Sequence, residues 1–208
     1  MTKDNHLAIL RKVSKRHFKI HGVLIFIILI SLSINGFFGV EAGIIRTAYQ
    51  LAKSQIMPII FREQLYTLLR SKSLTVNQAM DLSDVILDQN RIPITLALAM
   101  IKVESCLDPN AKSKKGAKGL TQITPIVQKE YSNHPIFKGK TNQIYDVSVN
   151  VKLGLFYLAD LHERFQDWHK ALRAYNAGPE NANNKEFDGY ANLVLKVEKD
   201  YQQKLNSL

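Results

Sequence analysis

Residues 92–125 read IPITLALAMIKVESCLDPNAKSKKGAKGLTQITP, and the rest of the chain is best understood outward from them. The first part begins at Pro93, and proline suits the first position of a helix because its missing N–H would be unpaired there. The residues that follow are apolar on every face of a helix, which is typical of a buried segment rather than an amphipathic one. We therefore predict a short buried helix that ends at Glu104.

Glu104 is an unusual residue for that position. The C-terminus of a helix carries partial negative charge, which disfavours a second negative charge beside it. Apolar surroundings also disfavour the ionised form, so both effects raise the pKa of the carboxyl group. A carboxylic acid that stays protonated near neutral pH is what a glycosidase uses as its general acid. The alternative is a glutamate that points into solvent from a helix end, as most glutamates do.

The residues that follow Glu104 complete a longer motif, which runs to Pro125 as E-S-x-x-x-P-x-A-x-S-x-x-G-A-x-G-L-x-Q-I-x-P. Three further blocks follow in order: DVSVNVKLGLFYL from Asp146, ALRAYNAGP at 171–179, and EFDGY at 186–190. Together they resemble the lytic transglycosylases of the soluble-lytic type (SLT), which have a lysozyme-like catalytic domain. The resemblance covers about residues 77–201 and implies a mainly α-helical fold.

The resemblance also implies roles for individual residues. Glu104 is the catalytic acid, Tyr175 donates a hydrogen bond to it, and Tyr190 helps to close the site. The expected substrate-binding residues are Ser105, Ser113, Gly119, Leu120, Gln122, Tyr175, Asn176 and Tyr190.

The implied reaction cleaves the β-1,4 bond between N-acetylmuramic acid and N-acetylglucosamine in peptidoglycan. Glu104 protonates the bond and then, as a base, takes the proton from the C6 hydroxyl that attacks C1, which leaves a 1,6-anhydromuramoyl end. Two alternatives remain open. One is a lysozyme-like hydrolase, similar to goose-type lysozymes, and the other is a non-catalytic glycan-binding scaffold of an envelope assembly.

Several residues of the motif blocks have a local rationale of their own. Gly116 and Gly119 permit positive φ angles and a close approach of the backbone to a ligand. Gln122 offers a donor and an acceptor to a sugar. Gly154 lies within a predicted helix, where glycine is costly, so we expect a close helix contact there. Thr121 stands where this family usually has methionine, a departure that would alter the floor of a sugar subsite.

Other chemistries find little support in the sequence. There is no H-E-x-x-H pattern, cysteine cluster, phosphate-binding glycine loop or acidic calcium loop, so we expect neither a metal nor a cofactor. Cys106 is the single cysteine, which excludes an internal disulfide, and we expect a buried thiol. Lysines surround the glycine loop at positions 112, 114, 115 and 118. They suit either a solvated loop or attraction of anionic wall polymers.

The positive charge is concentrated near the N-terminus. Residues 1–74 hold 11 Lys and Arg against 3 Asp and Glu, whereas residues 75–208 hold 17 against 15. The basic character therefore belongs to the N-terminal part, and we do not interpret it as a nucleic-acid-binding surface.

Residues 22–40 form an uncharged run of 19 positions that follows a basic segment, residues 1–21. A helix of that length spans about 28 Å, close to a bilayer core of roughly 30 Å. The positive-inside rule then predicts a single-pass anchor in the inner membrane, a cytoplasmic N-terminus and a catalytic domain in the periplasm or cell-wall space. A cleaved signal peptide is the alternative.

Residues 41–74 are expected to be a helical linker, with Pro58 as a kink or break, and residues 75–208 the catalytic domain. The linker is a candidate for contact with an envelope or secretion-machine partner, or a spacer. Residues 132–145 are polar and are predicted to be a loop. The aromatic residues in and just before this loop, Tyr131, Phe137 and Tyr145, could stack on sugars or pack beneath the loop.

Overall fold

The computed structural model describes residues 57–69 and 73–206. The chain divides into two compact units, Met1–Glu63 and Gln64–Leu208, of which the second contains every motif block. The α-helices that are described run in the order α3 (Met57–Leu69), α4 (Val76–Asp88), α5 (Ile94–Ser105), α6 (Pro125–Glu130), α7 (Val147–Phe165), α8 (Trp168–Ala177) and α9 (Asp188–Asn206). Two short 3₁₀ turns, η2 (Pro179–Asn181) and η3 (Lys185–Phe187), precede α9.

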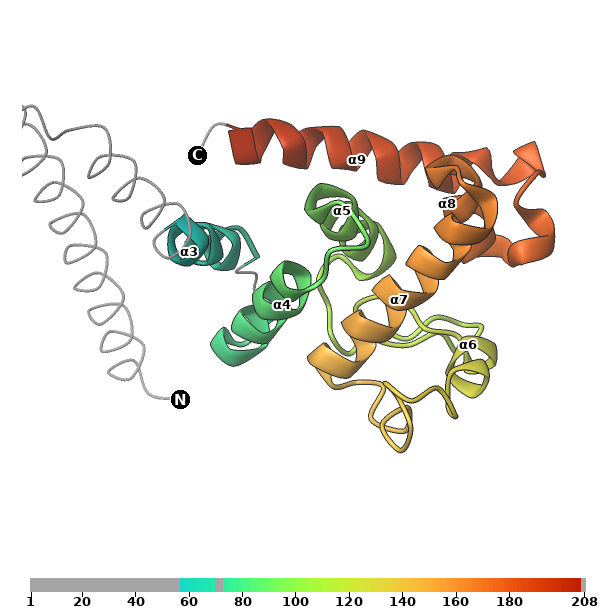
Figure 1. Ribbon diagram of the computed structural model, residues 1–208, viewed down its shortest axis with the longest axis horizontal. Coiled ribbons are helices and arrows are strands. Elements are labelled where there is room, and N and C mark those ends of the chain that lie inside the picture. The colour runs from blue at the N-terminus through green and yellow to red at the C-terminus, as the bar shows by residue number, and fades with distance from the viewer. Residues whose placement is uncertain (1–56, 70–72, 207–208) are drawn as a thin grey trace, which may run out of the picture. The chain divides into compact units, whose positions relative to one another are not determined.

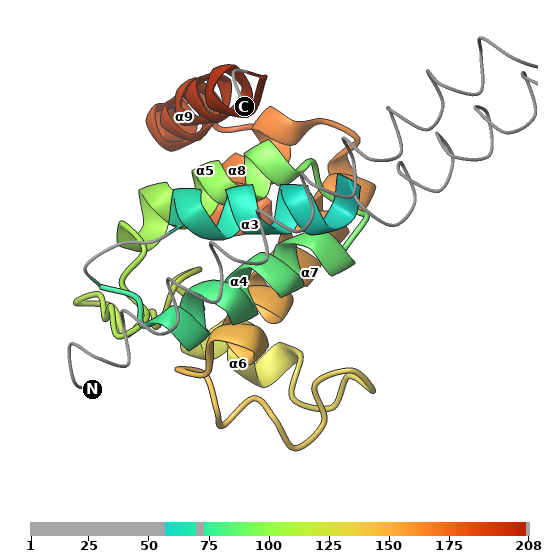
Figure 2. The ribbon, with the colours of Figure 1, turned by 90° about the vertical axis from the view of Figure 1, so that its left-hand side faces the viewer.

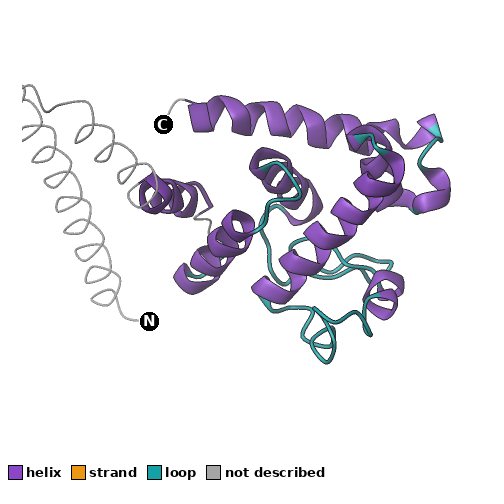
Figure 3. Cartoon of the chain, in the orientation of Figure 1, coloured by secondary structure: helices purple, strands orange, loops and turns teal. Residues whose placement is uncertain are grey.

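The mainly helical fold expected from the sequence is confirmed. Figure 3 shows helices joined by loops throughout the described part, where the only β-type pairings are two isolated bridges. The loop predicted at 132–145 is also present, between α6 and α7.

The helices begin where local capping residues favour a start. Thr75 caps α4 in a capping box with Gln78, in which each side chain bonds the backbone N–H of the other residue. Such a pair satisfies two of the donors that a helix N-terminus leaves unpaired. Thr124 and Asp146 cap α6 and α7 through single bonds from backbone N–H groups. Each of these three caps lies directly before the first residue of its helix.

The helix that ends in Glu104 lies at the centre of the second unit. Residues 96–101 of α5 are all buried, with exposed fractions of 1% or less. Helix α9 runs alongside α5 and packs against it, while α4 packs against α7 (Figures 1 and 2). This burial agrees with the apolar sequence of residues 96–101, because all faces of this part of the helix are covered.

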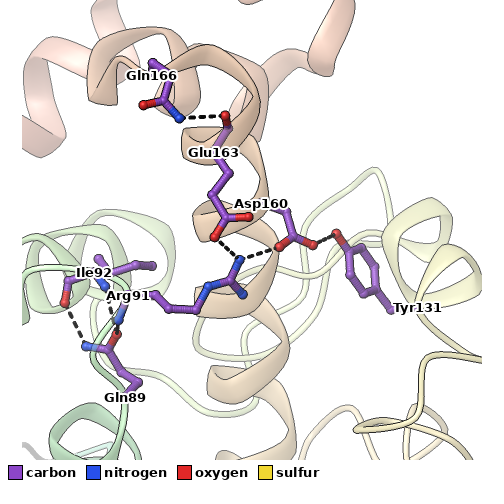
Figure 4. A network of polar contacts seen from close by, with 7 residues as sticks. All are labelled: Gln89, Arg91, Ile92, Tyr131, Asp160, Glu163 and Gln166. Atoms are coloured by element: carbon purple, nitrogen blue, oxygen red, sulfur yellow. Dashed lines mark hydrogen bonds and ion pairs between the residues drawn. The ribbon is translucent and has the colours of Figure 1, made fainter.

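A polar network holds the turn before α5 against α7 (Figure 4). The Arg91 guanidinium donates to Asp160 Oδ1 at 2.7 Å and to Glu163 Oε1 at 2.8 Å. Asp160 Oδ2 also accepts a 2.7 Å bond from the Tyr131 hydroxyl. This network fixes the start of α5 relative to α7, and so helps to place the far end of α5, where Glu104 lies.

Two predictions from the sequence fall outside this description. The apolar run at 22–40 lies outside the described residues, so the transmembrane anchor stays a prediction. Among the helices that are described, none is both long and apolar enough to cross a bilayer. The helical linker predicted at 41–74 is the second, because only residues 57–69 and 73–74 of it are described.

Candidate active site

Glu104 occupies the last turn of α5, one residue before the helix ends at Ser105. Its side chain is mostly withdrawn from solvent, and this burial raises the pKa of Glu104 to about 7. The raised value follows because a carboxylate loses more hydration than a carboxylic acid when both are buried. Near neutral pH the group can therefore give up a proton and take one back.

Tyr190, in the first part of α9, supplies the hydrogen bond to Glu104. Its hydroxyl donates to Glu104 Oε1 at 2.5 Å. A donor of this kind favours the ionised form, so it lowers the pKa of Glu104 and partly offsets the effect of burial. The prediction that Tyr190 belongs to the site agrees with this geometry.

The prediction that Tyr175 donates to Glu104 is wrong. The Tyr175 hydroxyl donates instead to the backbone carbonyl of Thr121 at 2.7 Å. Tyr175 is nevertheless close enough to Glu104 to be affected by its charge. Burial and then this charge raise the pKa of the Tyr175 hydroxyl well above its ordinary value. Burial and then Glu104 likewise raise the pKa of Tyr190. The two tyrosines beside Glu104, Tyr175 and Tyr190, therefore stay neutral at neutral pH.

The loop after α5 folds back on itself at its glycines. Gly116 and Gly119 have φ angles of +83° and +75°, as predicted. The Ser113 hydroxyl accepts a 3.0 Å bond from the backbone N–H of Ala117, which closes the turn. The Gln122 amide nitrogen donates to the carbonyls of Ala111 and Gly119, at 3.2 and 2.9 Å. Its donors are therefore used within the loop, and its amide oxygen is the atom that remains for a ligand.

Asn150, in the first turn of α7, anchors this loop. It is 1% exposed. Its Oδ1 accepts bonds from the backbone N–H and the hydroxyl of Thr121 at 2.9 and 2.8 Å. Its Nδ2 donates to the carbonyls of Lys118 and Ile144 at 3.0 and 2.9 Å. Every donor and acceptor type of the side chain is satisfied, which is how a buried amide is kept at low cost.

Two glycines make this anchoring possible. A Cβ atom on Gly119 would lie 2.3 Å from Asn150 Nδ2, and one on Gly154 would lie 2.4 Å from Thr121 Oγ1. The close contact expected at Gly154 is therefore present, but its partner is the loop at Thr121 rather than a helix. The close approach expected at Gly119 likewise involves Asn150 of the chain itself.

The sequence analysis did not predict that Asn150 and Thr121 anchor this loop to α7. Asn150 matches the family pattern, which was a usable signal, but nothing local shows that its partner lies 29 residues earlier. Thr121 is 0% exposed and bonded to α7. It therefore belongs to the anchor and not to the open floor of a sugar subsite.

The remaining predicted site residues are divided between the site and other places. The Ser105 hydroxyl donates back to the Ile101 carbonyl at 3.2 Å. Leu120 is 1% exposed and belongs to the hydrophobic core. Asn176 is exposed on α8, and no described contact joins its side chain to Glu104. Of the predicted set, Glu104 and Tyr190 are thus brought into direct contact.

Two further expectations concern Cys106 and metal binding. The expectation of a buried thiol is wrong, because Cys106 is exposed. It ends α5 in the left-handed conformation, with φ at +52°, while the next residue, Leu107, returns to the core. Among the described residues, no group of three or more His, Cys, Asp or Glu side chains could hold a metal ion.

The aromatic residues near the 132–145 loop have different environments. Tyr131 and Phe137 are 8% and 3% exposed, with ring centroids 6.3 Å apart. They pack beneath the loop, the second of the two predicted alternatives. Tyr145 is 41% exposed and stays accessible to a ligand.

The comparison with protein families agrees with these observations. Residues 81–192, more than half of the chain, match the family described as the Transglycosylase SLT domain. The match includes Glu104, Tyr190 and the anchor formed by Asn150 and Thr121.

Two curated relatives are each similar over less than half of this chain. A protein of Alteromonas sp. strain M-1, named for tributyltin chloride resistance, is 35% identical over 44% of this chain and 43% of its own length. A membrane-bound lytic murein transglycosylase F of Desulfosudis oleivorans is 34% identical over 44% of this chain and 20% of its own. The chain therefore spans less than half the length of the relatives it matches.

A solved structure shares the fold. An inactive mutant of the lytic transglycosylase Slt of Pseudomonas aeruginosa, in which a glutamate is replaced by glutamine, superposes with a TM-score of 0.53 and 28% identity. The alignment covers 61% of this chain and 24% of that chain. The lysozyme-like SLT fold is thereby established for the described helices.

Proposed function

Because this chain belongs to the Transglycosylase SLT domain family, we propose that it is a peptidoglycan lytic transglycosylase. It cleaves the β-1,4 bond between N-acetylmuramic acid and N-acetylglucosamine and leaves 1,6-anhydromuramoyl ends. Relatives and a solved neighbour are named as lytic transglycosylases, which supports the proposal.

The observation that carries the proposal is the state of Glu104. Its pKa of about 7 leaves it substantially protonated at neutral pH. It accepts a hydrogen bond from Tyr190, and no ion pair joins it to a cation within the described residues. A carboxyl group with a pKa near the working pH serves as both proton donor and proton acceptor, since neither form is scarce.

In the first step Glu104 acts as the general acid. It gives its proton to the glycosidic oxygen, the bond from that oxygen to C1 of the muramic sugar breaks, and the glucosamine side leaves with a hydroxyl group. The positive charge that develops at C1 is taken up by the carbonyl oxygen of the 2-acetamido group of the muramic sugar. No second protein carboxylate is required for this step, unlike in most glycosidases.

In the second step Glu104 acts as the base. The C6 hydroxyl of the muramic sugar attacks C1, the bond to the acetamido oxygen breaks, and the hydroxyl proton passes to the Glu104 carboxylate. The enzyme returns to its starting protonation state, and the product carries a 1,6-anhydro ring without consuming water. Tyr190 holds the carboxyl group in place through both steps.

The loop and the tyrosines complete the site. We assign the Gln122 amide oxygen to an N–H of the substrate, because the amide donors are used inside the loop. Ser113, Gly119 and Tyr175 shape the loop and its neighbour α8, and Asn176 lines the exposed margin. Ser105 and Leu120 support the site from the helix end and the core.

We also propose that residues 22–40 anchor the chain in the inner membrane and that residues 75–208 act in the periplasm. The uncharged run and the basic segment before it support this arrangement. Residues 41–74 would then connect the anchor to the domain, where an envelope or secretion-machine partner could bind.

The test is a mass spectrum of the fragments that the full chain releases from purified peptidoglycan. Anhydro ends, which are one water lighter than hydrolysed ends, are the expected result. Reducing ends carrying that water would instead show a lysozyme-like hydrolase. No release by a folded chain that still binds the polymer would favour the scaffold.

A further inference from the structure

The loop that follows Glu104 carries a strong and unbalanced positive charge. Residues 109–129 hold five lysines and neither aspartate nor glutamate. Four of these lysines fall between positions 112 and 118; those at 112, 114 and 115 are exposed, and Lys118 is half-buried. Within the described residues, none of the four forms an ion pair. A patch of one sign without internal neutralisation attracts ligands of the opposite sign.

The backbone places two of these lysines directly opposite one another. Lys112 and Lys118 form an antiparallel bridge. The bonds on either side of the bridge join the Ser113 N–H to the Ala117 carbonyl and the Gly119 N–H to the Ala111 carbonyl, both at 2.9 Å. Lys112 and Lys118 are therefore the non-hydrogen-bonded pair, in which facing side chains are closest.

Such an arrangement opposes folding rather than favouring it. Like charges directly opposite each other on paired strands are destabilising. Lys118 is also bridged to Ile123, which is 2% exposed, so the pair lies at the margin of the core. Solvent and salt screen charges less there than on an open surface. An anion held between the two ammonium groups would relieve the repulsion.

The hairpin that carries this pair leads directly into the proposed active site. The segment after Lys118 continues to Thr121, whose carbonyl accepts a hydrogen bond from the Tyr175 hydroxyl. That hydroxyl is in turn affected by the charge of Glu104. The Lys118 ammonium lies 6.0 Å from the centre of the exposed Tyr145 ring. A sugar stacked on Tyr145 would thus bring its substituents to Lys118.

We propose that Lys112 and Lys118 bind carboxylates of the peptide stems that the muramic sugars of the substrate carry. This inference rests on the proposed function. In a strand of N-acetylglucosamine and stem-bearing N-acetylmuramic acid, the sugars are neutral and the free carboxylates belong to the stems. A cationic pair beside the sugar site therefore recognises the stem, and makes stem-bearing strands better ligands than bare glycan.

The test measures binding without turnover. The full chain carrying Glu104→Gln is sedimented at low salt with insoluble stem-bearing peptidoglycan and, separately, with the same polymer after its stem carboxylates have been converted to neutral amides. Adding Lys112→Gln and Lys118→Gln should raise the Kd for stem-bearing polymer about three- to tenfold, as expected for two or more exposed ion pairs. The Kd for the amidated polymer should not change.

Matched variants control for charge alone. Lys196→Gln with Lys199→Gln removes two exposed lysines of α9, and this variant should bind stem-bearing polymer as the parent does. Lys112→Arg with Lys118→Arg keeps the charge and should keep the affinity. The glutamine pair should leave the Tm of the chain unchanged or raise it, because it removes a like-charge contact.

Several results would overturn the inference. An equal loss on the amidated polymer would assign the lysines to the sugar backbone, and a loss confined to phosphatidylglycerol vesicles would assign them to a membrane surface. No binding by the parent, or a lowered Tm, would also contradict it. If the lysines matter for stem binding while the unsubstituted chain forms no anhydro ends, the lysine subsite stands and the proposed reaction fails.

Discussion

Asn150 and Glu104 are both polar side chains withdrawn from solvent, but their partners differ. Asn150 holds four hydrogen bonds to Thr121, Lys118 and Ile144 through both ends of its amide. Glu104 holds one, from Tyr190, and its pKa is raised to about 7. The hydrogen-bonding capacity of the Asn150 amide is therefore filled at both ends, whereas that of the Glu104 carboxyl group is filled only in part.

This difference in partners gives Asn150 a structural role and Glu104 a chemical role within the same site. A buried amide with all its partners contributes rigidity, since breaking any one bond leaves another polar group unpaired. A buried carboxyl with one partner keeps a proton that it can give away. The Asn150 anchor holds the loop still, and Glu104, with its single partner, remains able to react.

Replacing Glu104 should have the largest effect on activity. Glu104→Gln keeps the shape and can still accept the Tyr190 hydrogen bond, but it cannot transfer a proton. We expect turnover of peptidoglycan to fall by about 10²–10⁴-fold, the usual contribution of a general acid, while circular dichroism and glycan binding are preserved. Near-normal turnover in this variant would remove Glu104 from the mechanism.

Replacing Asn150 should have the largest effect on stability. Asn150→Ala leaves the buried Thr121 N–H and the Ile144 carbonyl without partners, while the Lys118 carbonyl keeps its bond from the Ile123 N–H. We therefore expect the free energy of unfolding to fall by about 3 kcal/mol. Urea unfolding measures it. Asn142→Ala, at an exposed position of the loop between α6 and α7, is the control and should change stability by no more than about 0.5 kcal/mol. A similar small value at Asn150 would mean that the anchor is not structural.

The same comparison predicts how stability depends on pH. Unfolding returns Glu104 to an ordinary pKa near 4.5, whereas the folded value is about 7. Between these values the folded state binds more protons, so its stability falls as pH rises from about 4.5 to 7. Glu104→Gln lacks this loss and should exceed the unsubstituted chain by on the order of 2 kcal/mol at pH 8.

At pH 4 the two forms should be nearly equal in stability, because Glu104 is then neutral in both states. Thermal or urea unfolding at both pH values provides the measurement. A stability difference that is the same at pH 4 and pH 8 would show that Glu104 does not carry the shifted proton.

Removing the Tyr190 hydroxyl should have the smallest effect. The hydroxyl favours the ionised form of Glu104, so Tyr190→Phe should raise the pKa further and move the alkaline limb of the kcat/KM profile to higher pH. Tyr201→Phe alters a tyrosine lower on α9 and should leave the profile unchanged. A shift to lower pH in Tyr190→Phe would reverse the role we assign to this bond.

Local features of the sequence predicted much of the fold. The apolar run of α5 and the loop glycines at 116 and 119 each act within a few residues of where they stand, and the structure agrees with both predictions. The position of Glu104 at a helix end and the direction of its pKa shift follow from the same local physics.

Pairings across the fold could not be predicted in this way. The Tyr190–Glu104 bond joins residues 86 positions apart, and the packing of α9 on α5 determines which tyrosine reaches the carboxyl group. The motif contained both Tyr175 and Tyr190, but their partners depend on where α8 and α9 lie. Thr121 likewise read as part of a sugar subsite because its contact with Asn150 exists only once α7 is in place.

The most direct test of the account is the titration of the Glu104 carboxyl group itself. Carbon-13 NMR of the full chain with labelled glutamate, compared with Glu104→Gln to identify the resonance, follows that single group through the pH range. The account predicts a midpoint near 7. A midpoint near 4.5, the ordinary value, would show an ionised carboxylate at neutral pH and would contradict its role as the acid.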